Sequence, residues 1–135
     1  MTYVSWDDAF DVKENRMNSQ HRILFDYVNE YDAAFQEGAD LRKMIGIFDK
    51  IISYTAKHFA DEEAYMERIG YPALRSHRHI HKQLVARVLA YQERLASGDT
   101  MLLKEVRVFL KNWLTGHIKG VDTQYSEYAA HTRAA

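Results

Sequence analysis

Apolar and aromatic residues recur at alternating spacings of three and four positions along four long segments of the chain. This spacing places them on one face of an α-helix, the face that packs against other helices in a bundle. The pattern predicts helices over residues 18–37, 40–69, 72–97 and 99–130, after an irregular N-terminal arm over residues 1–17. The longest inward face is unbroken over nine positions: Leu41, Met44, Phe48, Ile51, Thr55, His58, Glu62, Tyr65 and Ile69.

Short loops separate the four segments. Each of the first three segments closes at a glycine, and the only proline opens the third: Gly38, Gly70, Gly98 and Pro72. Asp40 and Asp99 stand where a side chain would cap the helix that follows. Loops this short force consecutive helices to run antiparallel. We therefore predict an all-α, up-down-up-down four-helix bundle that forms one domain over residues 1–135.

Polar residues interrupt the predicted inward faces at one level of the bundle. The midpoint of His58 and Glu62 lies ten residues before Gly70, and that of His77 and His81 lies nine residues after it. At about 1.5 Å per residue, both pairs lie roughly 14 Å from this turn. Burying these groups costs on the order of several kcal/mol unless a shared partner satisfies them. The inward polar set is His21, Thr55, His58, Glu62, His77, His81 and His117.

Residues 77–81 read HRHIH, which places three histidines within five positions. On a β-strand all three would share one face, whereas on a helix the middle one points nearly opposite the others. Since the helical spacing continues on both sides, we predict that His77 and His81 face the core. His79 is then expected to face solvent, as is His131, which has no inward position.

The inward face of the fourth segment slips in phase after His117. Asp122 follows five positions later, which on an ideal helix is a rotation of 140°. A single π-turn or a broken turn around Gly116 to Gly120 would bring both side chains to the same face, and π-turns are frequent at functional sites. We predict one there, with Tyr125 as a candidate hydrogen-bond donor beside Asp122.

The composition narrows the chemistry that this layer can support. The chain has no cysteine, so thiolate and iron–sulfur sites are excluded and a metal must be held by His, Asp or Glu. The net charge of −1 gives no electrostatic argument for nucleic acid or an anionic membrane. No signal peptide or membrane-spanning run is apparent, so a cytoplasmic protein is expected. Five histidines and two carboxylates suit a pair of metal ions better than one.

The order and spacing of these residues resemble the complete ligand pattern of the hemerythrin family. The pattern is His21, His58-x-x-x-Glu62, His77-x-x-x-His81 and His117-x-x-x-x-Asp122. The length is similar to that of the single-domain bacteriohemerythrins. The resemblance implies two iron ions with an oxo or hydroxo bridge. The implied ligands are His77, His81 and His117 for one iron, His21 and His58 for the other, and Glu62 and Asp122 as carboxylate bridges.

The resemblance also implies a function. Dioxygen would bind reversibly at the open position of the two-histidine iron, for storage, transport or delivery, and the protein would not be an enzyme. In the family, a tryptophan and a leucine before the last histidine line the oxygen pocket, here Trp113 and Leu114. Leu24, one turn after His21, and Phe59, one residue after His58, are further candidates.

Two alternatives stay open from the sequence. Diiron oxidases use carboxylate-rich sites with Glu-x-x-His elements, which are absent from the inward faces here. An oxygen or redox sensing module would need an output partner, and the sequence identifies no protein partner.

Overall fold

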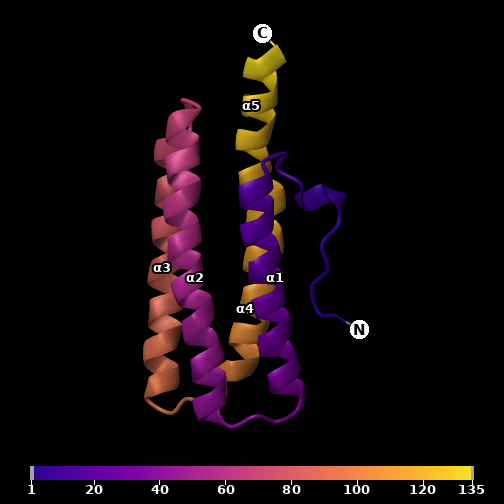
Figure 1. The fold of residues 1–135 in the computed structure, drawn as a ribbon. Helices are drawn as coiled ribbons and strands as arrows, with labels where there is room; N and C mark the ends of the chain where they lie inside the picture. The colour runs from indigo at the N-terminus through magenta and orange to yellow at the C-terminus, as the bar shows by residue number, and fades with distance from the viewer. Residues whose placement is uncertain (1, 135) are drawn as a thin grey trace.

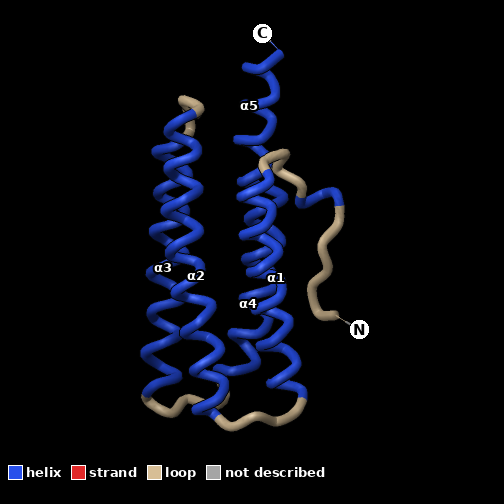
Figure 2. Tube along the Cα trace, viewed as in Figure 1, coloured by secondary structure: helices blue, strands red, loops and turns tan. Residues whose placement is uncertain are grey.

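The computed structural model describes residues 2–134 and shows the predicted all-α architecture, a four-helix bundle without strands in this range. The four long helices run antiparallel to their neighbours along the chain (Figure 1). Short loops join them at the two ends of the bundle (Figure 2). The helical elements are η1 (Asp8–Phe10), α1 (Asn15–Gln36), α2 (Leu41–Arg68), α3 (Leu74–Ala96), α4 (Leu102–His117), η2 (Ile118–Asp122) and α5 (Thr123–Ala134).

Helices α4, η2 and α5 form one continuous rod, the fourth helix of the bundle (Figure 1). Around the bundle, α1 packs against α2 and α4, and α3 packs against the same two helices. The inward faces supply a core of buried apolar side chains, among which Tyr31, Met44, Phe48 and Leu110 are fully enclosed.

The helix ends follow from local capping. Helix α1 begins at Asn15, three residues before the expected start, because the Glu14 side chain accepts a hydrogen bond from Met17 N at 2.8 Å. Asp40 caps α2 as predicted, accepting from Lys43 N at 2.9 Å. Gly70 ends the second helical segment with φ of +68°, a left-handed conformation that suits glycine.

Two expected helix starts were wrong. Pro72 lies in a turn, and α3 begins two residues later at Leu74. Asp99 does not cap α4, which begins at Leu102, because its carboxylate instead accepts from Arg94 Nη2 at 2.9 Å.

The N-terminal arm packs on the outside of α1. Val4 exchanges two hydrogen bonds with the Asn29 side chain, at 2.8 and 2.9 Å. The rings of Trp6 and Phe10 pack against Phe25, with centroids 5.7 and 4.9 Å away. These contacts fix the arm against the helix that carries His21.

The predicted π-turn is confirmed. Residues Ile118–Asp122 form a π-helical segment inside the fourth rod. Its wider turn brings His117 and Asp122 to the same side, with His117 Nε2 and Asp122 Oδ1 3.0 Å apart. An unbroken α-helix would have rotated Asp122 out of the core.

Candidate metal centre

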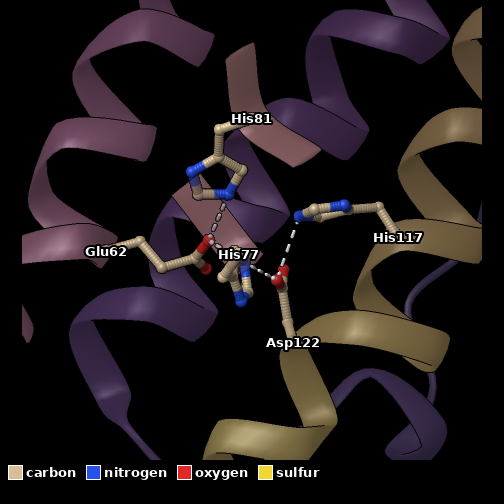
Figure 3. A group of neighbouring side chains, drawn as sticks. All are labelled: Glu62, His77, His81, His117 and Asp122. Atoms are coloured by element: carbon tan, nitrogen blue, oxygen red, sulfur yellow. Dashed lines mark ion pairs between the residues drawn. The ribbon is translucent and has the colours of Figure 1, made fainter. Parts of the chain in front are cut away.

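All four helices contribute to one buried layer of ligand-type side chains, which lies toward the Gly70 end of the bundle. Its least exposed members, His21, Glu62 and Asp122, have no accessible surface. Figure 3 shows Glu62 from α2 and Asp122 from η2 facing the histidines of α3 and α4. The structure brings together every predicted ligand: His21, His58, Glu62, His77, His81, His117 and Asp122.

These residues form two groups, each with ligand atoms within 4.8 Å of one another. One group contains three histidines and the other contains two, and both include the same two carboxylates. The groups are Glu62, His77, His81, His117 and Asp122, and His21, His58, Glu62 and Asp122.

Glu62 presents one carboxylate oxygen to each group. Its Oε1 lies 3.1 Å from His81 Nε2, in the three-histidine group. Its Oε2 lies 3.3 Å from both His21 Nε2 and His58 Nε2, in the two-histidine group.

Asp122 has the same arrangement on the opposite side of the layer. Its Oδ1 lies 3.0 Å from His117 Nε2 and 3.1 Å from His77 Nε2, as the dashed lines of Figure 3 indicate. Its Oδ2 lies 3.2 Å from His21 Nε2. Each carboxylate can therefore bridge two cations, with one oxygen on each.

Many of these buried atoms have no hydrogen-bond partner within the described residues. Buried polar atoms without a partner are rare in proteins, and a bound cation is one way to satisfy them. The imidazole nitrogens and carboxylate oxygens also form a donor set typical of iron and zinc. The unpaired atoms of the layer are His21 Nδ1, His77 Nε2, His81 Nε2, His117 Nε2, Glu62 Oε1, Asp122 Oδ1 and Asp122 Oδ2.

The electrostatics of the layer favour positive charge. Burial alone would lower the pKa of His21 and His77, but the carboxylates of Asp122 and Glu62 close to them raise it to about 9 in each. Burial opposes ionisation of the carboxylates too, yet the neighbouring histidines, His58 foremost, hold the pKa of Glu62 well below its usual range. Without a metal, protons therefore balance the carboxylate charge, and metal binding must release them.

Hydrogen bonds outside the ligand set orient its members. Tyr125 donates to Glu62 Oε2 at 2.9 Å, so the predicted donor is confirmed as a contact of the layer, although its acceptor is Glu62. The sequence analysis missed two acceptors, Gln20 and Glu63, although each directly adjoins a predicted ligand. Their contacts are His58 Nδ1 to Gln20 Oε1 at 2.6 Å and His81 Nδ1 to Glu63 Oε2 at 2.8 Å.

A small cavity adjoins the two-histidine group. Its volume of about 10 Å³ is close to the minimum that holds one water molecule. All four residues predicted for the oxygen pocket line it, together with Ile118, which the sequence analysis missed. The lining is His21, Leu24, His58, Phe59, Trp113, Leu114, His117, Ile118 and Asp122.

The remaining two histidines lie outside this layer. His79 and His131 are exposed, as the helical spacing predicted. Thr55, the other inward polar residue, is buried but belongs to neither ligand group.

No helix among residues 2–134 has a stretch both long and apolar enough to cross a membrane.

Comparison with known proteins identifies the family. The family model described as "Hemerythrin HHE cation binding domain" matches residues 13–129. A bacteriohemerythrin of Stenotrophomonas maltophilia (strain R551-3) is 31% identical over 128 residues, which cover 94% of this chain and 82% of the relative. A myohemerythrin of Riftia pachyptila is 30% identical over 120 residues, which cover 89% of this chain and 88% of the relative.

The structural comparison agrees. A crystal structure of wild-type hemerythrin superimposes with a TM-score of 0.84 at 28% identity, covering 93% of this chain and 96% of that one. The match over residues 13–129 includes every ligand-type residue of the buried layer. By sequence, fold and the composition of this layer, the chain belongs to the hemerythrin family.

Proposed function

We propose that this protein binds dioxygen reversibly at a pair of iron ions held in the buried layer. One observation carries the proposal: each of two carboxylates turns one oxygen toward a three-histidine group and the other toward a two-histidine group. This donor set suits two adjacent cations. When bound, the two irons would supply the electrons that reversible dioxygen binding requires.

In this proposal, each ligand residue has a place at one or both iron positions. His77, His81 and His117 would hold one iron, and His21 and His58 would hold the other. Glu62 and Asp122, which belong to both groups, would be shared between the two irons. The two-histidine position has one protein ligand fewer, so it would be the open position that takes dioxygen.

The cavity supports this choice of open position. It adjoins His21 and His58, and its other walls include apolar side chains such as Leu24, Phe59 and Leu114. Exposed fractions of 1 to 4% for these three side chains keep bulk water away. Exclusion of water favours reversible binding, because water promotes side reactions of reactive intermediates.

Tyr125 keeps its proton in this environment. Burial, reinforced by the charges of Glu62 and Asp122, raises the pKa of its phenol well above 10. The hydroxyl therefore remains a donor to Glu62 Oε2 and holds this carboxylate in its bridging orientation.

Binding is favoured over turnover for two reasons. Five imidazoles and two carboxylates would occupy most of the coordination positions of two irons, and the small cavity beside them has no room for an organic substrate. A role without catalysis is part of the proposal, as are storage, transport or delivery of dioxygen. A cytoplasmic location and the absence of nucleic-acid binding stay predictions from the sequence.

Cycling the reduced, iron-loaded protein between air and vacuum tests the proposal. We expect a charge-transfer absorption band to form in air, disappear under vacuum and return over repeated cycles. An irreversible spectral change would contradict the carrier role, and steady consumption of oxygen with a reductant at enzyme-like rates would identify an oxidase.

A further inference from the structure

The two metal positions differ in the acceptors that their histidines contact. His81 Nδ1 lies 2.8 Å from a carboxylate oxygen of Glu63. His58 Nδ1 lies 2.6 Å from Gln20 Oε1, an amide oxygen. The orientation of this amide follows from its other end, because Gln20 Nε2 donates to Asp61 Oδ2 at 2.8 Å. An anion thus contacts the three-histidine group, whereas a neutral amide contacts the two-histidine group.

Surface ion pairs hold both acceptors in place. Glu63 accepts from Arg78 Nε at 3.0 Å, and the two side chains are 24% and 44% exposed. On the other side of the layer, Asp61 pairs with Arg16 and Lys57, each at 3.1 Å. The amide of Gln20 therefore stands between the Asp61 charge and its histidine, while Glu63 touches its histidine directly.

This asymmetry has an electronic consequence. A histidine that donates its outer N–H to a carboxylate becomes a more basic metal ligand, and charge-assisted hydrogen bonds are about twice as strong as neutral ones. A more basic ligand stabilises the more highly charged, oxidised metal ion.

We propose that Glu63 is a positioning residue that lowers the reduction potential at the three-histidine position. This inference rests on the proposed diiron function. The neutral amide of Gln20 leaves the two-histidine position easier to reduce. An external one-electron reductant would then reduce the two-histidine position first and the three-histidine position second.

Glu63→Gln tests the role of the charge with almost no change of shape. We expect it to raise a midpoint potential of the iron-loaded protein, measured anaerobically by spectroelectrochemistry. A tenfold change in the reduction equilibrium constant corresponds to about 59 mV for one electron. Arg78→Gln leaves the carboxylate in place without its cation, so its potential should shift in the opposite direction.

A charge-neutral exchange tests the other side. In the double variant Gln20→Glu with Asp61→Asn, the negative charge moves from the surface to the His58 contact, and the new amide can still donate to the new carboxylate. The net charge is unchanged, so a lower midpoint potential reports the charge placed at the His58 contact and not the total charge of the protein. This variant also keeps the inference testable if Glu63→Gln loses iron.

Glu67→Gln is the matched control. Glu67 is 72% exposed, lies 3.8 Å from Arg78 and does not contact any of the metal-ligand histidines, so its neutralisation should leave both potentials unchanged. If it shifts them as far as Glu63→Gln does, net charge alone acts and the inference is wrong.

The remaining outcomes separate this inference from the proposed function. Unshifted potentials in Glu63→Gln with two irons bound would overturn the inference and leave the diiron site intact. Failure of the wild-type protein to bind an iron pair would overturn both.

Discussion

Removal of the Tyr125 hydroxyl is the substitution whose effect on the free energy of unfolding follows most clearly from the structure. It is buried with no exposed surface and donates to Glu62 Oε2 at 2.9 Å. Tyr125→Phe deletes this one donor and keeps the ring, whose centroid lies 5.6 Å from that of Tyr65 and 6.4 Å from that of Tyr71. The change therefore isolates the hydrogen bond from the packing.

A hydrogen bond to a charged group contributes about 1.5–3 kcal/mol to stability, and more when its loss leaves a buried charge unpaired. We expect Tyr125→Phe to lower the free energy of unfolding of the metal-free protein by this amount. For a domain of this size the midpoint of thermal unfolding should fall by about 5–15 °C. Iron affinity should fall by about 10–100-fold, because the bridging carboxylate loses its orienting donor.

Urea and thermal unfolding of the metal-free protein, followed by circular dichroism, measure the first effect, and anaerobic iron titration measures the second. Tyr128→Phe is the control, because its hydroxyl donates to a neutral backbone oxygen, that of Gly70, in an exposed contact at 3.1 Å. It should cost about 1 kcal/mol or less. If Tyr125→Phe is as stable as wild type, or if the control loses as much, the reasoning about the buried carboxylate is refuted.

Three further predictions concern the ligands, the protons and the cavity. His79→Ala should leave the iron content and the oxygen spectrum intact, whereas His77→Ala should abolish the three-histidine position. If elemental analysis shows that His79→Ala loses iron, the assignment of His79 to the solvent face of its helix is wrong. The pKa of about 9 for His21 and His77 in the metal-free protein means that their protonation stabilises it fully below pH 6.5. The unfolding free energy of the metal-free protein, measured in urea, should therefore fall as pH rises from about 6.5 to 9. Iron loading should abolish this pH dependence, because the metal displaces the protons. If the unfolding free energy of the metal-free protein does not change with pH, His21 and His77 do not hold these protons. Leu24→Ala should lower stability by about 2–5 kcal/mol and speed the decay of the oxygenated spectrum, since water gains access; an unchanged decay rate would remove this side chain from the pocket.

The spacing of inward residues predicted the fold and the meeting of five histidines and Glu62 in one layer, because both depend on the helical period. His58 and Glu62 are one turn apart on α2, and His77 and His81 are one turn apart on α3. Their nearly equal distances from Gly70, ten and nine residues, place the pairs at one level. The π-turn was predictable because no regular helix could bring both His117 and Asp122 inward.

The hydrogen bonds around the ligands could not be predicted in the same way. Gln20 and Glu63 lie beside the inward faces, and their contacts cross from α1 to α2 and from α2 to α3. Such contacts depend on the rotation of each helix about its axis, which the spacing of apolar residues fixes only coarsely. Ile118 reached the cavity for a related reason, since the π-turn changes the direction in which it points.

The helix starts show a second limit. A proline or an aspartate after a glycine is compatible with the first turn of a helix, but competing local contacts decide where the turn begins. Asp99 accepts a hydrogen bond from the Arg94 side chain, and α4 begins at Leu102 without a side-chain cap. None of these shifts moves a predicted ligand.

The central claim is that one chain holds two iron ions that together bind one dioxygen reversibly. Anaerobic loading of the metal-free protein with ferrous iron, followed by measurement of oxygen uptake and of its release under vacuum, tests it most directly. The account predicts two irons per chain and one dioxygen taken up for each iron pair, with full release and undiminished uptake in the next cycle. If the iron titration saturates at one metal ion per chain, or if oxygen is consumed and not released, the claim is contradicted.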